Sequence, residues 1–308
     1  MRALDLRRET VMAATYDAVA RRVVDQLVAA IETDNAGTWT MPWHRLGNAR
    51  HLSPINATTG TGYKGGNVLA LALEGIERGY ASARWATYKQ WAGQDAQVRR
   101  GEKATQLIRW VTKTTDTDAG GGGGEKRQRM IPMVFHVFNA DQCDHPDTTD
   151  ETATIEAEPE GSDVDAWLSA IGADVVVGGD RAFYDPTADR ITLPPRTSFA
   201  SDGDFWSTSI HEHVHWSGHR TRLNRDTLTN NDPAQYALEE LTAELGAAII
   251  CAHHGIEPTP RASHAAYLAH WLEQLNAEPR TLFRTASTAQ TAADHLHELA
   301  TTPATTSH

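Results

Sequence analysis

Two histidines and a glutamate at metal-site spacing form the most chemically specific pattern in this chain of 308 residues. His211 and His215 lie four residues apart in the pentapeptide His-Glu-His-Val-His. In a helix they share one face, so both could donate a ring nitrogen to the same Zn²⁺. Glu212 would then lie beside the metal, where it could take a proton from a water. Five residues are a short match in a chain with 15 histidines, so a solvated pair of helical histidines is the alternative.

The segment 237–250 could supply the third ligand that a catalytic zinc usually has. Its apolar spacing and good helix formers predict a buried helix, in which a carboxylate is costly unless it is paired or bound to a metal. We therefore expect Glu240 to be the third ligand. Glu244, one turn further on, would accept the second N–H of a ligating histidine. Glu239, Glu244 and His219 remain alternatives for the third ligand, and a solvated acidic stripe is the alternative for the whole helix.

Composition indicates a globular protein of the cytoplasm. The hydrophobic share is 40%, and no apolar run approaches the ~20 residues that a membrane span needs. The N-terminus lacks the apolar core of a signal peptide, so we expect neither export nor a membrane partner. Cys143 and Cys251 are the two cysteines, too few for a disulfide framework and consistent with a reducing compartment.

Charge is distributed unevenly along the chain and indicates two domains. The net charge is −12 overall, yet residues 1–142 hold 19 Lys and Arg against 14 Asp and Glu, a net of +5, which leaves −17 for residues 143–308. The first part could attract a polyanion and the second would repel one. The acidic segment 143–162 has few apolar residues and predicts a flexible linker. We therefore expect domains over 1–142 and 163–308, each with its own core.

The hydrophobic pattern of the first domain predicts helices around a β-hairpin. Apolar residues recur at helical spacing early in the chain, and β-branched and aromatic residues mark the strands. Thr87 has the side chain of a helix N-cap, and the five glycines at 120–124 predict a mobile hairpin tip. The expected segments are a helix over 15–32, a glycine-punctuated loop over 56–67, a helix over 68–76, a short helix after Thr87, and strands over 106–112 and 130–138.

The second domain is expected to combine a small antiparallel sheet with the metal-site helices. Short apolar runs alternate with turn signals before the histidine pentapeptide, and the segment 185–189 has the composition of a turn. The expected segments are a helix over 164–171 and strands over 174–177, 182–184 and 191–193. The fold class is therefore α+β with two domains, the first of mixed α/β type.

Aromatic residues interleaved with cations indicate that the first domain binds single-stranded nucleic acid. Every base has a face to stack on an aromatic ring, worth about 1–3 kcal/mol per base, while cations follow the phosphates. The alternative is that most of the tryptophans belong to the core, as large aromatics usually do. The expected DNA contacts are Trp43, Tyr63, Lys64, Arg84, Lys89, Arg99, Arg100 and Lys103.

Taken together, these blocks resemble the ArdC-type antirestriction proteins of conjugative plasmids and mobile elements. The resemblance covers nearly the whole chain and rests on long, ordered blocks. In the first domain the blocks are 42–43, 56–67, 84–90, 98–103 and 137–142. In the second they are 180–184, 191–194, 211–219, 222–226 and 239–246.

The resemblance implies a single-stranded-DNA-binding domain joined to a zincin-like metallopeptidase domain. It implies a role in protecting incoming DNA from the recipient's restriction enzymes, with a host restriction-system protein as a further partner. On the matching positions, His211 and His215 would be metal ligands, Glu212 the general base and Glu240 the third ligand. The chain departs from the family pattern in the glycine run at 120–124, and in His213, where an apolar residue is usual.

The leading hypothesis is a cytoplasmic protein that binds single-stranded DNA and carries one Zn²⁺, or another divalent metal, per chain. Water activated by Glu212 would attack a peptide carbonyl. Tyr184, or alternatively His219, would donate a hydrogen bond to the resulting oxyanion. The rivals are a DNA-binding protein with a structural metal, and a metallopeptidase toxin with a targeting domain. A protein substrate, the restriction systems affected and the oligomeric state do not follow from the sequence.

Overall fold

The computed structural model of the protein describes residues 2–32, 49–116, 126–144, 161–230, 232–257 and 264–302. Three expectations fall outside these ranges. They are the DNA contact at Trp43, the glycine tip at 120–124 and the part of the linker from 145 to 160.

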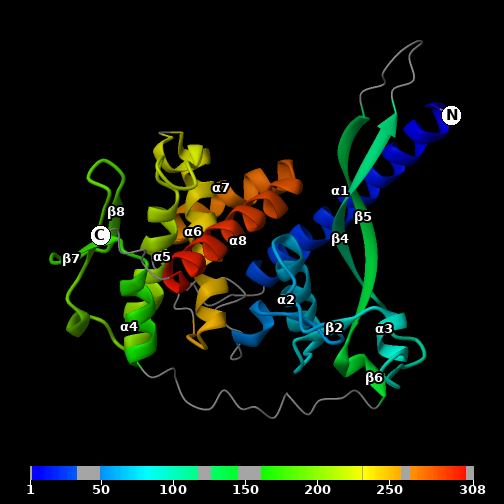
Figure 1. Cartoon of the computed structure of the whole chain (residues 1–308), viewed down its shortest axis with the longest axis horizontal. Helices are drawn as coiled ribbons and strands as arrows, with labels where there is room; N and C mark the ends of the chain where they lie inside the picture. Colours follow the sequence, from blue (N-terminus) through cyan, green and yellow to red (C-terminus); the bar gives the residue numbers. More distant parts are fainter. Residues whose placement is uncertain are drawn as a thin grey trace.

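The first half of the chain consists of a long helix, a two-stranded hairpin and short elements packed at the base of that hairpin (Figure 1). The predicted helices and strands are confirmed, and most extend beyond the predicted bounds. The elements are α1 (Arg2–Glu32), η2 (Ala49–Leu52), β1 (Ile55–Asn56), α2 (Gly66–Arg78), β2 (Arg84–Ala86), α3 (Tyr88–Ala92), β3 (Gln97–Val98), β4 (Thr105–Asp116), β5 (Lys126–Asn139), η3 (Ala140–Gln142) and β6 (Cys143–Asp144).

The main sheet of this half has the strand order β1-β2-β5-β4. The β1 strand is parallel to β2, whereas β2 with β5 and β5 with β4 are antiparallel. Thr87 caps α3 as predicted: its side chain accepts from the Gln90 backbone N–H, and the Gln90 side chain bonds back to the Thr87 backbone. This reciprocal pair satisfies two N–H groups that a helix start would leave without partners.

The predicted linker begins too early. Cys143 and Asp144 form β6, which pairs antiparallel with β3 and closes a second, two-stranded sheet. Asn139 fixes the turn before it, because its side chain accepts from the Asp141 backbone N–H at 2.9 Å. The composition of this segment is polar, but backbone pairing does not require apolar side chains, so composition alone missed the strand.

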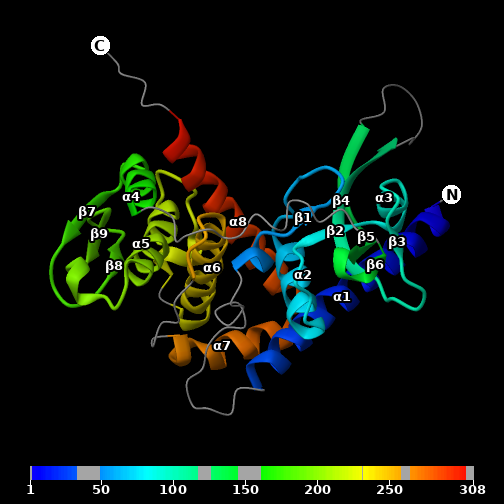
Figure 2. The same cartoon turned by 90° about the horizontal axis from the view of Figure 1, so that it is seen from below.

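The second half is mainly helical, with one small sheet before the long helices (Figure 2). The elements are α4 (Gly161–Ala170), β7 (Asp174–Val177), β8 (Phe183–Asp185), β9 (Arg190–Leu193), η4 (Arg196–Ser198), α5 (Asp202–Ser217), η5 (Asp226–Thr229), α6 (Pro233–His253), α7 (His264–Ala277) and α8 (Arg280–Thr301). The α+β class with a helical metal-site region is therefore confirmed.

The small sheet is mixed, and the expectation of a purely antiparallel sheet was wrong. Its order is β7-β9-β8, with β8 antiparallel to β9 but β7 parallel to β9. The chain reverses direction between β7 and β8 and again between β8 and β9. Two reversals restore the original direction, so β7 and β9 run the same way. Because β7 pairs with the edge of β9 that is not occupied by β8, the β7–β9 pair is parallel. The Asp185 carboxylate fixes the second reversal by accepting from the Thr187 backbone N–H at 2.8 Å.

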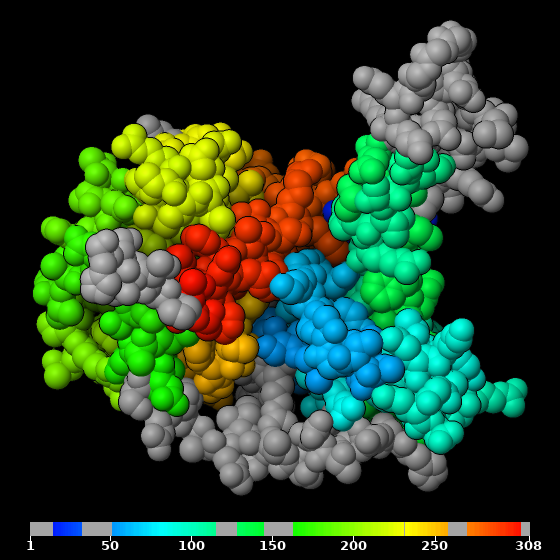
Figure 3. Space-filling view, viewed as in Figure 1, coloured from blue at the N-terminus to red at the C-terminus, as the bar shows by residue number. Residues whose placement is uncertain are grey.

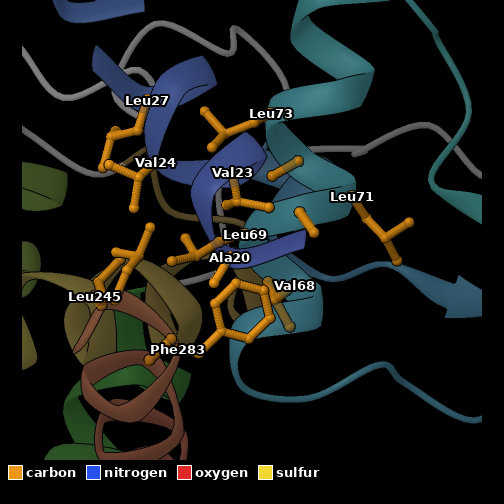
Figure 4. Packing of buried hydrophobic residues seen from close by; sticks show 14 of the residues in the cluster. Ala20, Val23, Val24, Leu27, Val68, Leu69, Leu71, Leu73, Leu245 and Phe283 are labelled. Carbon is orange, nitrogen blue, oxygen red and sulfur yellow. The ribbon is translucent and has the colours of Figure 1, made fainter. Parts of the chain in front are cut away.

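The two halves share a hydrophobic core. One buried cluster joins residues of α1 and α2 to residues of α6, α7 and α8, and Figure 4 shows Leu245 and Phe283 beside α1 and α2 side chains. The start of α2 comes close to α8 because Gly66 has no side chain: a Cβ at Gly66 would lie 2.2 Å from the Phe283 ring. The expectation that each half has its own separate core was therefore wrong at this contact.

A second buried cluster, built entirely from the second half, lies under the candidate site. It packs α5 and α6 against α4, α8 and the small sheet. Gly246 of α6 lets α5 come close, since a Cβ at this position would meet the Val214 methyl groups at 3.0 Å. None of the helices in the described part of the chain is both long and apolar enough to cross a membrane.

Candidate metal centre

The helix α5 carries the histidine pentapeptide and is fixed at both ends. At its start the Ser201 hydroxyl accepts from the Asp204 backbone N–H at 3.1 Å, which caps the helix. At its end Gly218 closes the last turn. His211 and His215 therefore lie one turn apart on a regular helix, as predicted, and both are buried.

Three potential ligand atoms converge between α5 and α6. The Nε2 atoms of His211 and His215 lie 3.1 Å apart. The Glu240 carboxylate lies 3.7 Å from His211 Nε2 and 3.6 Å from His215 Nε2. Within the described ranges, this is the group of three or more metal-binding side chains whose ligand atoms all lie within 4.8 Å of one another.

Neighbouring carboxylates orient the two imidazoles so that this convergence suits a cation. Glu239 Oε1 lies 3.1 Å from His215 Nδ1, and Glu244 Oε2 lies 3.8 Å from His211 Nδ1. The Glu239 carboxylate accepts from N–H, so His215 carries its proton on Nδ1 and directs its Nε2 lone pair toward Glu240. Glu244 is beyond hydrogen-bond distance of His211 Nδ1 and acts on that ring through its charge. A cation between the two imidazoles and the carboxylate would be held by all three ligand atoms at once. The residues present therefore fit a bound divalent metal.

Glu239 is held in place by three further hydrogen bonds and so acts as a support of His215. Arg225 donates from Nε at 3.0 Å and from Nη2 at 2.6 Å, and the Thr227 hydroxyl donates at 2.5 Å. Burial alone would raise the pKa of Glu239, but hydrogen bonds from His215 and Arg225 lower it to about 2. The sequence analysis considered Glu239 only as an alternative ligand. Arg225 lay in a matching block, yet nothing in the sequence linked it to Glu239.

Arg225 also binds the end of the histidine helix. Its guanidinium donates to the Ser217 hydroxyl at 2.8 Å and to the Val214 carbonyl at 2.7 Å. Gly218 leaves room for it, since a Cβ there would lie 2.6 Å from the guanidinium carbon. One arginine thus joins the C-terminus of α5 to the carboxylate that orients His215.

Burial would raise the pKa of Glu240, but its contact with the His211 imidazole, the charges of both histidines and a hydrogen bond from Tyr236 lower it well below its ordinary value. Tyr236 precedes Glu240 by one helical turn, and 40% of its surface is exposed. Sequence reasoning missed this phenol. Its spacing of four residues from Glu240 was the signal that could have found it.

Glu212 is buried beside the cluster, where its charge raises the pKa of His215. His213 points elsewhere: its Nδ1 donates to the Ser209 carbonyl at 2.7 Å. Burial lowers the pKa of His213 to about 4, so it is neutral at physiological pH and replaces an apolar residue without adding charge.

Tyr184 is bound to other partners in this arrangement, and its expected role as an oxyanion donor stays a prediction. Its hydroxyl donates to Asp189 Oδ1 at 2.8 Å and accepts from Arg222 at 3.4 Å. A phenol has one proton to donate, and in this arrangement Tyr184 donates it in the hydrogen bond to Asp189. His219, the alternative, lies against Thr221 and Asp189, at 2.8 Å and 3.8 Å. Burial and the Asp189 bond raise the pKa of Tyr184 strongly.

The expected DNA contacts that the structure describes differ in solvent exposure and in whether their side chains are bonded to other parts of the protein. Lys89, Arg100 and Lys103 are exposed, whereas Tyr63 is half-buried and its hydroxyl donates to the Trp85 carbonyl at 3.2 Å. The other cations have protein partners: Lys64 with Asp294 at 2.7 Å, Arg99 with Glu102 at 3.2 Å, and Arg84 with the Ala57 carbonyl at 3.3 Å.

Two tryptophans of the first half, Trp85 and Trp91, are core residues, as the alternative interpretation held. Among the tryptophans of this half that the structure describes, Trp110 on β4 is the exception, with 51% of its surface exposed. It was noted among the aromatics of this half but not selected as a contact, because the sequence does not show which face of the strand is covered.

Both halves of the chain match known domain families. Residues 162–288 match the zincin-like metallopeptidase family MPTase-PolyVal. Residues 17–139 match the N-terminal domain of anti-restriction factor ArdC. The fold and the convergent histidines thus define a zincin-like metallopeptidase domain joined to an ArdC N-terminal domain.

Solved structures extend the match to nearly the whole chain. The metal-free antirestriction ArdC protein from plasmid R388 is 35% identical, with a TM-score of 0.77, 91% of this chain covered and 97% of that chain. Its Mn(II)-bound structure aligns at 33% identity with a TM-score of 0.73, over 92% of this chain and 98% of that one. This protein belongs to the ArdC family of antirestriction proteins, which confirms the resemblance found in the sequence.

Curated relatives include one of equal size and one much larger. The uncharacterized protein y4eC of Sinorhizobium fredii is 36% identical over 285 residues, 91% of each chain. DNA primase TraC of Escherichia coli is 37% identical over 291 residues, which are 89% of this chain but 26% of that protein. The chain therefore spans about a quarter of the primase.

Proposed function

We propose that the protein protects the incoming DNA of a mobile element from host restriction by combining single-stranded-DNA binding with a metallopeptidase site. The observation that carries the enzymatic part is the convergence of His211, His215 and Glu240. The carboxylate of Glu212, next to these residues, would act as the general base that accepts a proton from the attacking water. Membership of the ArdC family supports the protective role. A cytoplasmic location and contact with a host restriction protein remain predictions.

The metal is proposed to be Zn²⁺, held by His211, His215 and Glu240, with Mn²⁺ as an alternative because a relative's structure contains it. A divalent cation there would act as a Lewis acid on a peptide carbonyl. Among the chain's own residues, Glu239 fixes the tautomer of His215, Glu244 places a negative charge beside His211, and Glu212 accepts a proton from the attacking water.

Substituting Glu212 by Gln is expected to lower peptide hydrolysis by about 10²–10⁴-fold while the metal stays bound. The amide keeps the size of the side chain but cannot accept the proton. Cleavage of a protein substrate and metal content per chain are measured together on the same preparation. Turnover equal to that of the unmodified protein would exclude this mechanism.

Single-stranded DNA is expected to bind more tightly than duplex of the same sequence, with affinity falling as salt rises. The bases of a duplex are already stacked on each other, so aromatic side chains cannot reach them. Fluorescence anisotropy over a series of salt concentrations measures both effects. Equal affinity for the two forms would contradict stacking.

Conjugation into a restricting recipient separates the proposal from its rivals. Loss of protection in the Glu212→Gln protein favours catalysis as part of the function. Unchanged protection favours a DNA-binding protein with a structural metal. Growth arrest of the producing host, with no effect on restriction, favours the toxin.

A further inference from the structure

A groove of about 420 Å³ lies where the first half meets α8. Its lining includes Trp110 of β4, Tyr16 of α1, Lys64, and Phe283 and Arg284 of α8. Figure 3 shows the atoms of α8, coloured orange-red to red, against the blue atoms of the first half. Both halves of the chain therefore build the groove.

Trp110 offers this groove an unusually exposed aromatic ring. Its exposed fraction is 51%, whereas Trp85 and Trp91 are completely covered. An edge-on contact with Tyr16, at 5.6 Å between ring centroids, supports the indole from within. Tyr16 in turn contacts Phe283 edge-on at 5.7 Å. The ring is thus held by packing while half of its surface stays in contact with solvent.

Two cations of the groove form ion pairs with exposed carboxylates, and Arg284 also donates to the Thr281 hydroxyl at 2.9 Å. Lys64 Nζ lies 2.7 Å from Asp294, and Arg284 Nη1 lies 2.9 Å from Glu278. All four side chains are about half exposed or more. Such surface pairs contribute little to stability, so either cation can exchange its carboxylate for a phosphate at small cost.

We infer that this groove binds single-stranded DNA, with one base stacked on Trp110 and the adjoining phosphates held by Arg284 and Lys64. The inference rests on the proposed DNA binding and goes further, because it places the strand across both halves of the chain. A flat base of any sequence matches a supported indole beside cations. The acidic second half then contributes a phosphate contact through α8, contrary to what its net charge alone suggests.

Substitution of Trp110 by Ala is expected to weaken binding of a fluorescent single-stranded oligodeoxynucleotide by about 5-fold to 150-fold, as loss of one stacked base predicts. Trp110→Phe keeps a ring and should recover much of the affinity. Phe183→Ala is the matched control, since Phe183 is 48% exposed but lies on β8, outside the groove. Arg284→Gln should reduce the slope of log affinity against log salt by about one.

Photo-cross-linking locates the base directly. An oligodeoxynucleotide with one 5-iododeoxyuridine should attach to the peptide that contains Trp110. Thermal unfolding of each variant checks that it is folded. Unchanged affinity in Trp110→Ala, with cross-links only at other aromatics such as Tyr88, would overturn the inference and leave DNA binding intact. If the unmodified protein binds no single-stranded DNA, the proposed function itself is wrong, and the inference falls with it.

Discussion

Replacing Arg225 by alanine is expected to destabilise the folded protein by about 3–5 kcal/mol, the cost of leaving a buried charge without its partner. Glu239 has no exposed surface and depends on Arg225, His215 and Thr227 for compensation. The same substitution removes the hydrogen bonds that Arg225 donates to the Val214 carbonyl and the Ser217 hydroxyl, although Ser217 still donates to Val214. The free energy of unfolding is measured by denaturant titration of metal-free protein.

The matched control is Arg190→Ala. Arg190 lies 2.7 Å from Asp174, but both side chains are about half exposed. An exposed pair of this kind contributes about 0–1 kcal/mol. Similar losses in the two variants would show that burial of Glu239 does not govern its energetics.

The Arg225→Ala effect should also depend on pH in a definite direction. The pKa of Glu239 is held at about 2 against the raising effect of burial, so the carboxylate is charged at neutral pH and its pairing stabilises the fold there. That contribution is lost as the pH falls through the folded-state pKa. The difference between the unmodified protein and Arg225→Ala should therefore be largest near neutral pH and shrink in acid.

Removing a metal ligand is expected to abolish measurable metal binding. His211→Ala and Glu240→Gln each leave two protein ligands where a catalytic site uses three, and even loss of a supporting carboxylate typically costs about 10–100-fold in affinity. Isothermal titration with Zn²⁺ and Mn²⁺ measures the loss. His219→Ala should bind normally, because His219 lies against Thr221 and Asp189. Full binding by Glu240→Gln would return the third-ligand role to Glu239 or Glu244.

Metal affinity should fall as the pH is lowered. A histidine must lose its proton from Nε2 to bind. Burial would lower the pKa of His215, but its bond to Glu239 and the charges of Glu240 and Glu239 raise it above the ordinary value. A proton therefore competes with the metal from a higher pH than it would at an isolated histidine.

The histidine pair was predictable because its geometry is local. Residues four apart on any helix share a face, and Ser201 and Gly218 then set only where α5 begins and ends. The adjacent glutamates were harder to assign. Glu239 and Glu240 differ by about 100° around α6, and which of them faces the histidines depends on how α5 packs against that helix.

Roles that depend on distant partners were not predictable. Tyr184 has the chemistry of an oxyanion donor, but Asp189 and Arg222 reach it only after the small sheet has folded. The same limit applied to the tryptophans: Trp85 and Trp110 both lie on strands, and tertiary packing alone makes one a core residue and the other a surface residue.

The common core of α1, α2, α6, α7 and α8 has a thermodynamic consequence for the whole molecule. Elements that bury the same apolar surface lose it together, so we expect the ArdC N-terminal domain and the zincin-like domain to unfold as one cooperative unit. By linkage, whatever binds the native state at either place stabilises both. Metal taken up between α5 and α6 would then also protect the hairpin side from proteolysis, and a bound strand would protect the helices of the metal centre.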